Sequence, residues 1–217
     1  MTGPREGGQA PATLSVLIVC AANLCRSPLI AFAAGRAGGV ITMSAGLLAR
    51  DGMPMCPMSA TRISLHDGGA RHVESFRSRA LSSLDLDGFD LLLTATTAMR
   101  SDVVKQHPKL RGKTFTVLET LALGKMPLSG TELDEVRSNG PAAVMFARRG
   151  TVSSSPARRR ALLRSRENSL DISDGHTDRG NRHHLATADL AERAGSELGT
   201  QLRQWQGAAV TVNDPGP

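Results

Sequence analysis

The chain contains 217 residues, enough for one ordinary α/β domain with a full core. Aromatic residues make up 3% of the chain and tyrosine is absent, so Leu, Val, Ile, Ala and Met must form the core. Three cysteines are too few for a disulfide framework, and their odd number favours free thiols in a reducing compartment. The first twelve residues lack the apolar segment of a secretory signal, and the apolar run at 14–19 is too short to cross a bilayer. The sequence predicts a cytoplasmic protein without a membrane segment.

The formal charge of +6 is concentrated in one part of the chain, because seven arginines lie between positions 148 and 166. This basic tract lacks the interleaved aromatic residues and the surrounding module of a nucleic-acid-binding protein. We therefore expect no nucleic-acid partner. The tract remains a candidate contact for a protein partner.

Strand-like and helix-like segments alternate from the start of the ordered chain. Residues 1–13 are expected to form a flexible tail. The nearly continuous apolar run at 14–19 predicts a strand buried on both faces of a parallel sheet. From Ser27 onwards apolar residues recur at helical spacing, and a glycine pair at 38–39 ends that helix. Residues 40–43 predict a second short strand.

The alternation continues further along the chain. Pro57 is expected to open a helix in which Met58 and Leu65 share one face. Residues 89–94 predict a third strand followed by a helix, and residues 113–118 predict a fourth strand near a sheet edge. This order predicts a doubly wound, four-stranded parallel sheet with helices on both faces, as in flavodoxin-like folds.

Residues 124–169 interrupt this pattern with Gly, Ser, Pro and clustered Arg. We interpret them as a partly mobile insertion, with short helices predicted near 133–136 and 159–163. A final helix is expected from about Leu185, and its apolar residues form one stripe. The stripe consists of Ala191, Ala194, Leu198, Leu202 and Trp205. The prediction is one domain over residues 14–205, followed by a tail at 206–217.

The first predicted strand leads into Cys20-Ala21-Ala22-Asn23-Leu24-Cys25-Arg26-Ser27-Pro28. Cys20 and Arg26 enclose five residues, the spacing of a loop that can wrap one tetrahedral oxyanion. Converging N–H groups, the positive end of the next helix and Arg26 would stabilise a Cys20 thiolate and bind a phosphate dianion. Ser27 could donate its hydroxyl to the departing thiolate. The implied reaction is phosphoryl transfer to sulfur, then hydrolysis of the thiophosphate. The predicted phosphate-binding residues are Ala21, Ala22, Asn23, Leu24, Cys25, Arg26 and Ser27.

This loop resembles the signature of low-molecular-weight protein tyrosine phosphatases. Three further segments resemble landmarks of that family in the same order: Ser44-Ala45-Gly46, Phe76-Arg77-Ser78-Arg79-Ala80-Leu81 and Asp90-Leu91-Leu92-Leu93-Thr94. The resemblance covers most of residues 14–123 and resumes at 170–205. It is to a bacterial member of the family with an insertion before the acid loop. It implies the phosphatase I architecture, with Cys20 as nucleophile, Arg26 as phosphate clamp, Asn23 as a loop-geometry residue and Ser27 as thiolate partner.

The resemblance also implies a general acid, an aspartate followed by proline in a loop before the last helix. Asp174 occupies that place, but Gly175 replaces the proline, and His176 and Thr177 replace the expected aromatic residues. Glycine is expected to leave the acid less pre-organised. A simple turn at Asp174-Gly175 is the non-catalytic interpretation. The other candidate acids are Asp171 and Asp178.

The missing tyrosines bear on the substrate, because aromatic residues flank the pocket in relatives and stack on the phosphotyrosine ring. Leu47 follows Ser44-Ala45-Gly46 here, so stacking is expected to be weaker, and another phosphorylated residue or a small phosphate ester competes with phosphotyrosine as the substrate. Cys25 has the family spacing of a partner that captures an oxidised nucleophile. A small buried loop residue explains Cys25 equally well.

The remaining cysteine and histidines offer weaker signals. His183 and His184 are adjacent, so they point to different faces of a helix and are expected to be solvated. Cys56 stands alone in the sequence, and packing is the expected role. Because the chain has no close-spaced ligand pairs and no nucleotide-binding glycine loop, we expect neither a metal nor a cofactor.

Three functions follow from these residues. The leading one is a cysteine-dependent phosphatase that hydrolyses a phosphomonoester, on a protein or a small molecule, through a phosphocysteine. Arsenate reduction with a small-thiol partner needs only Cys20 and is the alternative from the same fold. A catalytically weak phospho-binding module would explain the altered acid loop.

Overall fold

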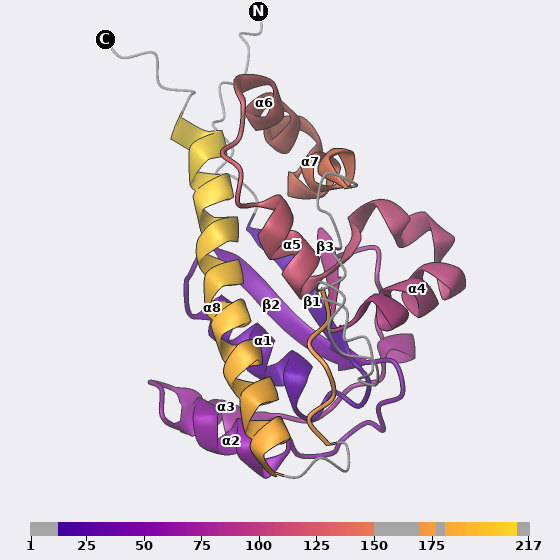
Figure 1. Ribbon diagram of the computed structural model, residues 1–217, viewed down its shortest axis with the longest axis vertical. Coiled ribbons are helices and arrows are strands. Elements are labelled where there is room, and N and C mark those ends of the chain that lie inside the picture. The colour runs from indigo at the N-terminus through magenta and orange to yellow at the C-terminus, as the bar shows by residue number, and fades with distance from the viewer. Residues whose placement is uncertain (1–12, 150–169, 177–180, 212–217) are drawn as a thin grey trace, which may run out of the picture.

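The computed structural model describes residues 13–149, 170–176 and 181–211 (Figure 1). At its centre is a four-stranded sheet in the order β2-β1-β3-β4, and all three pairings are parallel. The strands are β1 (Leu14–Cys20), β2 (Val40–Gly46), β3 (Leu91–Thr94) and β4 (Thr114–Thr116). The predicted α/β class, with a four-stranded parallel sheet, is confirmed.

The central strand β1 separates two apolar cores. Val16 and Ile18 face one core, and Leu17 and Val19 face the other. Successive side chains of a strand point to opposite faces, so a strand covered on both sides needs apolar residues at nearly every position. This explains the unbroken apolar run in the sequence.

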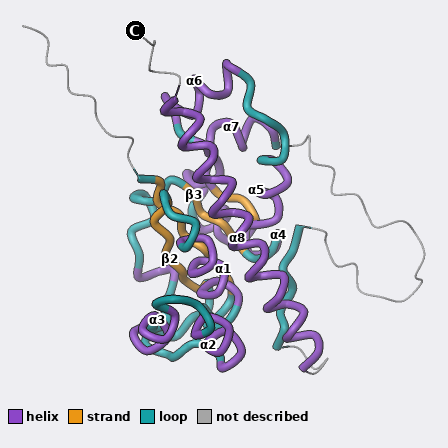
Figure 2. Tube along the Cα trace, turned by 90° about the vertical axis from the view of Figure 1, so that its left-hand side faces the viewer, coloured by secondary structure: helices purple, strands orange, loops and turns teal. Residues whose placement is uncertain are grey.

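Three helices cover the first face: α1 (Arg26–Gly35), α5 (Val117–Leu123) and α8 (Asn181–Thr211). Figures 1 and 2 show α8 as one long helix that crosses beside α1. Two glycines of α8 permit this approach, because a Cβ at Gly195 would lie 2.6 Å from the Ile30 oxygen, and one at Gly199 would overlap the Ala34 oxygen. The predicted apolar stripe of the last helix is buried, although α8 begins four residues before Leu185.

The second face carries α4 (Thr97–Gln106) and the short 3-10 helices η1 (Leu81–Ser83) and η2 (Pro108–Lys113). Two helix pairs lie at opposite ends of the molecule (Figure 1). One pair is α2 (Pro57–Ser64) with α3 (Gly69–Ser75), and the other is α6 (Gly130–Asn139) with α7 (Pro141–Arg148). None of the helices described here is long and apolar enough to cross a bilayer.

Two local expectations differ from the structure. The fourth strand is shorter than residues 113–118, because Thr116 caps a new helix: its hydroxyl accepts from the Glu119 N–H, and Glu119 accepts from the Thr116 N–H. The strand does lie at the sheet edge. The prediction that Leu65 shares a helix face with Met58 is wrong: α2 ends at Ser64, Leu65 is 80% exposed, and Ile63 is the buried residue.

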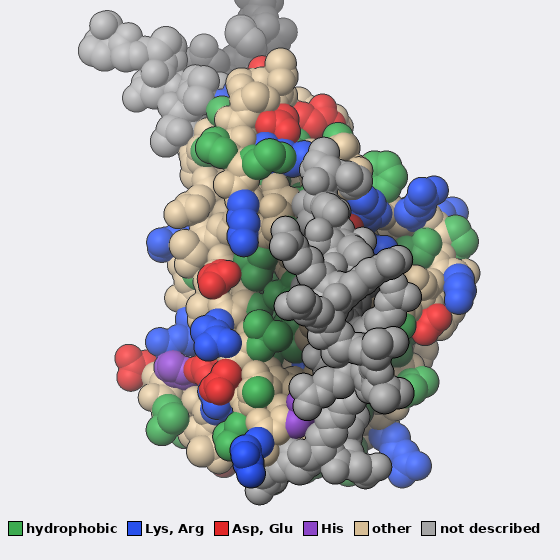
Figure 3. Space-filling model, viewed as in Figure 1, with side chains coloured by type: hydrophobic (Ala, Val, Ile, Leu, Met, Phe, Trp, Pro, Cys, Tyr) green, Lys and Arg blue, Asp and Glu red, His purple; other side chains and the backbone are tan. Residues whose placement is uncertain are grey.

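The start of the predicted insertion is helical. The helix expected near 133–136 falls within α6, whereas the one expected near 159–163 lies outside the described residues, as does the predicted N-terminal tail up to residue 12. The prediction of a C-terminal tail from residue 206 is wrong for residues 206–211, because α8 continues through them to Thr211. Arg148, the first arginine of the basic tract, is buried against Glu132 and donates to the carbonyl oxygen of Leu123. Arg149 pairs with Glu119. These two arginines therefore stabilise the packing of the domain. On the face shown in Figure 3, the described acidic and basic side chains are interspersed.

Candidate active site

The candidate site lies where β1 ends and α1 begins, at the carboxyl edge of the parallel sheet. Ligands of open α/β sheets bind at this edge, because the connecting loops and helix N-termini meet there. Cys20 is the last residue of β1 and Arg26 the first of α1, so the intervening residues form a loop between them.

The Cys20 thiol is buried beside one hydroxyl. Its Sγ atom lies 3.1 Å from Oγ of Ser27, which is itself fully buried. The Ser27 oxygen also accepts a hydrogen bond of 2.9 Å from the Asn23 side-chain amide. The Ser27 hydroxyl has two acceptors for its proton within reach, the Cys20 sulfur and the Ala45 carbonyl oxygen at 3.2 Å.

Asn23 ties the loop to its surroundings. It has a φ of 56°, the one positive φ among the described non-glycine residues. Its Nδ2 donates to Ser27 and to Ser44 of β2, and its Oδ1 accepts from the Arg79 N–H at 2.8 Å. Asparagine tolerates this left-handed backbone better than most residues, and its amide provides both a donor and an acceptor for the neighbours.

Gly46 explains why the Ser44-Ala45-Gly46 segment matters for the loop. A Cβ at Gly46 would lie 2.5 Å from the Ala21 oxygen and 2.7 Å from the Asn23 nitrogen. The next two residues donate backbone hydrogen bonds back to the loop, from Leu47 to Cys20 and from Leu48 to Ala21. The end of β2 thus lies directly against the loop, and only glycine fits at the contact.

Arg26 and Asp174 are brought together from distant parts of the sequence. The Arg26 side chain is 5% exposed; its Nη2 lies 2.7 Å from Oδ2 of Asp174, and its Nη1 donates to the Ile172 oxygen. The Asp174 carboxylate is 42% exposed, so it borders solvent at the rim of the loop. The candidate clamp and the candidate acid therefore form one ion pair beside the nucleophile's loop.

The loop that carries Asp174 is anchored by the residues before it. Ile172 is fully buried and its N–H donates to the carbonyl oxygen of Ala95, the residue after β3. Asp171, an alternative acid, instead accepts from the Thr97 N–H at the start of α4. A Cβ at Gly175 would lie 2.9 Å from the His184 Cα, so glycine allows the loop to pack against α8. Asp178, the other alternative, lies outside the described residues.

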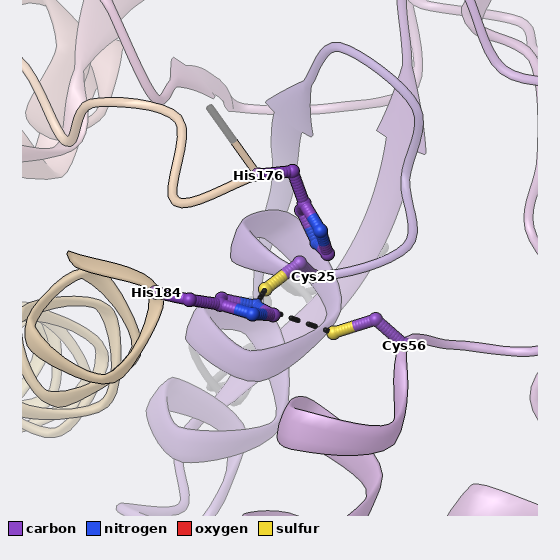
Figure 4. Close-up of side chains that lie close together, drawn as sticks. All are labelled: Cys25, Cys56, His176 and His184. Atoms are coloured by element: carbon purple, nitrogen blue, oxygen red, sulfur yellow. Dashed lines mark hydrogen bonds between the residues drawn. The ribbon is translucent and has the colours of Figure 1, made fainter. Parts of the chain in front are cut away.

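Cys25 and Cys56 meet two histidines next to the site (Figure 4). The Sγ of Cys25 lies 3.1 Å from Nε2 of His184, and the Sγ of Cys56 lies 3.8 Å from the same nitrogen. His176 and His184 stack, with ring centroids 4.1 Å apart. Cys56 is buried, as expected, but its thiol also lies beside a histidine. The prediction that His184 is solvated is wrong, because its side chain is half-buried against the two sulfurs. No spacing in the sequence signals this group, because its members come from four separate segments.

The two thiols of this group are hydrogen-bonded to each other. The hydrogen bond with Cys56, followed by burial, raises the pKa of Cys25, and the same bond lowers the pKa of Cys56. His183, which neighbours His184, faces elsewhere, and its Nε2 lies 3.1 Å from the Asp174 carbonyl oxygen. The adjacent histidines thus point in different directions, as expected, but both contact parts of the site.

The aromatic residues do not line the loop in the way the family resemblance implies. Trp205 lies in the core below the Arg148 guanidinium, 5.5 Å from the ring centroid. His176, at a position where an aromatic residue was expected, turns its ring to His184. Leu47, the residue that follows Ser44-Ala45-Gly46, is partly buried and packs against the second core, and the next residue, Leu48, is 81% exposed.

The sequence is similar to two curated phosphatases. EpsP of Ralstonia nicotianae, named a probable low molecular weight protein-tyrosine-phosphatase, is 31% identical over 106 residues, 48% of this chain and 71% of EpsP. Etp of Escherichia coli, named a low molecular weight protein-tyrosine-phosphatase, is 29% identical over 114 residues, 52% of this chain and 75% of Etp. No protein-family model matches the sequence.

Solved structures share the fold at lower identity. The YwlE arginine phosphatase from Geobacillus stearothermophilus has a TM-score of 0.55 at 22% identity, over 88% of this chain and 94% of YwlE. The tyrosine phosphatase Wzb from Escherichia coli K30, solved with sulphate, has a TM-score of 0.54 at 17% identity, over 87% of this chain and 97% of Wzb. These neighbours support the fold, and the match to EpsP extends it to common ancestry. The chain belongs to the low-molecular-weight protein-tyrosine-phosphatase family.

Proposed function

We propose that this protein hydrolyses phosphomonoesters in two steps, with Cys20 as the nucleophile. The Cys20 thiolate attacks phosphorus, the P–O bond to the leaving group breaks, and the phosphoryl group becomes bound to sulfur. Water then attacks phosphorus, the P–S bond breaks, and inorganic phosphate and the Cys20 thiolate are released. The proposal is carried by one observation: the loop that begins at Cys20 ends at Arg26, whose guanidinium forms an ion pair with Asp174.

Each neighbouring residue has a defined role in this scheme. Arg26 would bind two oxygens of the phosphate. The phosphate dianion would compete with the Asp174 carboxylate for the Arg26 guanidinium. Protonated Asp174 would donate its proton to the leaving oxygen and, as a carboxylate, later accept one from water. Ser27 would donate its hydroxyl to the Cys20 thiolate, and Asn23 would position Ser27. The N–H groups of residues 21–27 would bind the remaining phosphate charge.

The proposed substrate is a phosphorylated residue on a protein or a small phosphate ester. Leu47 and Leu48, which donate backbone hydrogen bonds to Cys20 and Ala21, are aliphatic, and this supports weaker stacking on an aryl ring than aromatic walls would provide. The family members above are named for tyrosine, and a structural neighbour is named an arginine phosphatase. Parallel kcat/KM measurements with phosphotyrosine and phosphoarginine peptides would assign the class. A preference for phosphoarginine would mean that a P–N bond breaks in place of the P–O bond, so that the substrate is a phosphoramidate and not a phosphomonoester. Low activity on both peptides would favour a small ester.

Trapping of the phosphoenzyme tests the mechanism. The protein is mixed with an aryl phosphate, denatured within milliseconds and digested, and the peptides are analysed by mass spectrometry. We expect a phosphoryl group on Cys20 in the wild type and in Cys25→Ser. Turnover that survives in Cys20→Ser, or a phosphoryl group on Cys25 or Cys56, would overturn the proposal.

The same preparation separates the alternative functions. Arsenate reduction would appear as arsenite formed with a small thiol at a rate that exceeds phosphate-ester hydrolysis. A binding module would bind phosphate without turnover and without a trapped intermediate. A reducing, cytoplasmic compartment is part of the proposal, and the three cysteines, all free thiols in the structure, support it.

A further inference from the structure

We propose that Cys25, Cys56, His176 and His184 form a four-ligand site for a zinc ion. This inference goes beyond the phosphatase chemistry and does not depend on Cys20. One ligand atom from each residue lies within 4.8 Å of all the others. The sequence predicts no metal because the chain has no close-spaced ligand pair, but folding brings these four side chains together (Figure 4).

The spacing of the ligand atoms suits a tetrahedral zinc ion. Zinc binds sulfur at about 2.3 Å and imidazole nitrogen at about 2.0–2.1 Å, which separates neighbouring ligand atoms by about 3.4–3.8 Å. The contacts from His184 Nε2 to Cys25 and Cys56, 3.1 and 3.8 Å, bracket this separation. Small side-chain rotations would therefore bring the group onto an ion without a change in the backbone.

The chemistry of the group favours zinc over the common hard cations. Thiolate and imidazole ligands select zinc and related transition metals, whereas magnesium and calcium prefer oxygen. Two thiolates and two neutral imidazoles also cancel the charge of a divalent ion, so the buried site would carry no net charge. Both sulfurs are buried, while His184 is half-buried and His176 is exposed, so the ion could enter from the histidine side.

Ser59 supports the two sulfurs as an outer partner. Its hydroxyl lies 3.3 Å from the Cys25 Sγ and donates to the Cys25 carbonyl, and its N–H donates to the Cys56 Sγ at 3.5 Å. Hydrogen bonds of this kind orient metal ligands and tune their charge. The sulfurs are thus held in place from the protein side, and their other sides face the two imidazoles (Figure 4).

The ion would join four segments that are distant in the sequence. Cys25 ends the phosphate loop, Cys56 caps α2, His176 follows the acid loop, and His184 lies in the first turn of α8. Cys25 is adjacent to Arg26 and His176 is two residues from Asp174, so the metal would hold the two partners of the ion pair together. It would supply the rigidity that Gly175, in place of proline, removes. With four protein ligands the site would be structural, not catalytic.

Metal binding would also alter the chemistry open to Cys25. A zinc-bound Cys25 thiolate is not available to form a disulfide with an oxidised Cys20. The proposed site therefore competes with the reversible-protection role that the family spacing of Cys25 suggests.

Cobalt substitution of the full-length protein tests the site independently of catalysis. After chelation of bound metal, Co²⁺ is titrated into the reduced protein and absorption is recorded. We expect one equivalent to produce a thiolate-to-cobalt charge-transfer band and tetrahedral d–d bands, both abolished by Zn²⁺. Metal analysis of the untreated protein should give one zinc per chain. Zn²⁺ should raise the Tm of the stripped protein, because the ion binds the folded state.

Matched variants assign the ligands. Cys56→Ser and His184→Ala should weaken cobalt affinity at least about 10-fold and remove the tetrahedral bands. His107→Ala, an exposed histidine after α4, should leave them unchanged, as should Cys20→Ser. Since Cys20→Ser abolishes the proposed hydrolysis but not the metal signal, failure of either proposal is visible without the other.

Three results would overturn the zinc site. One is a cobalt spectrum without the thiolate band; another is a spectrum that Cys56→Ser does not change. The third is a Cys25–Cys56 disulfide in the protein purified without reductant, seen as one reactive thiol where three are expected after denaturation with a chelator. If Cys56→Ser does not fold, His176→Ala replaces it, because His176 is exposed and its loss leaves no buried gap.

Discussion

Arg26 and Asp174 form an ion pair of 2.7 Å although 148 residues separate them in the sequence. The arginine begins α1 and is almost completely buried, whereas the aspartate lies in the loop before α8 and borders solvent. The pair connects the phosphate loop to the proposed acid loop. The carboxylate of the candidate acid is therefore in direct contact with the guanidinium of the candidate clamp.

Replacement of Asp174 tests its role as the acid. We expect Asp174→Asn to lower kcat by about 10²–10⁴-fold for phenyl phosphate, because a poor leaving oxygen needs a proton. The loss should be much smaller for dinitrophenyl phosphate, whose leaving group departs as an anion. The measurement is steady-state hydrolysis of both esters. Asp171→Asn is the matched control, since its carboxylate caps α4; the same dependence on leaving group in that variant would transfer the role to Asp171.

Ser27→Ala is expected to slow the second step. The Ser27 hydroxyl lies 3.1 Å from the Cys20 sulfur and would stabilise the thiolate that leaves the phosphocysteine. Loss of one such donor lowers kcat by about 10²-fold or more. Stopped-flow hydrolysis of nitrophenyl phosphate should then show a burst equal to one turnover. Ser44→Ala removes the other hydroxyl that Asn23 contacts; a burst of equal size there would mean that the Cys20–Ser27 contact is not responsible.

The contact between α1 and α8 predicts a large effect at Gly199. A methyl group there would overlap the Ala34 oxygen, so Gly199→Ala should lower the free energy of unfolding by about 1–3 kcal/mol. At Gly207 of the same helix, an added Cβ would meet no described atom within 4 Å apart from its chain neighbours and the helix's own backbone. Gly207→Ala should therefore be neutral or stabilising by up to about 1 kcal/mol, because alanine is the better helix former. Urea unfolding of both variants checks this, and equal destabilisation would contradict the close packing.

The pair between Glu132 and Arg148 predicts a pH-dependent stability. Hydrogen bonds from Arg148, together with the Ser129 N–H, lower the pKa of Glu132 from 4.5 to about 2. Because the folded pKa lies below the ordinary one, the carboxylate stabilises the folded protein. This contribution is complete above the ordinary pKa and is lost as the pH falls through about 2. We expect Glu132→Gln to cost about 1 kcal/mol at neutral pH.

Unfolding measured from neutral pH downwards checks the sign of this effect. The difference between wild type and Glu132→Gln should shrink as the pH approaches 2, the folded pKa of the carboxyl. Asp134→Asn on the same helix is the control: its pair with Arg137 is on the surface, with the aspartate 72% exposed, and its loss should change little. A constant difference for Glu132→Gln at all pH values would refute the role of the ion pair.

The sequence alone determined the parts that depend on local order. Three such parts each lie within one segment: the apolar run of β1, the spacing from Cys20 to Arg26 and the apolar stripe of α8. The apolar patterns of β1 and α8 indicate which of their faces are buried. The α/β class follows because such segments alternate. The family resemblance rests on the same local features.

Only the tertiary structure decided which distant residues meet. The approach of Asp174 to Arg26, and of His184 to Cys25, depends on the path of α8 across α1, which no spacing in the sequence encodes. In the sequence, Gly175 in place of proline indicates a less rigid loop around Asp174. In the fold, the same glycine allows this loop to pack against α8. Leu65 lies one heptad after Met58, the spacing of residues on one helix face, but α2 ends at Ser64, before Leu65. Periodicity describes a face within one element, whereas contacts between elements depend on how their ends are placed.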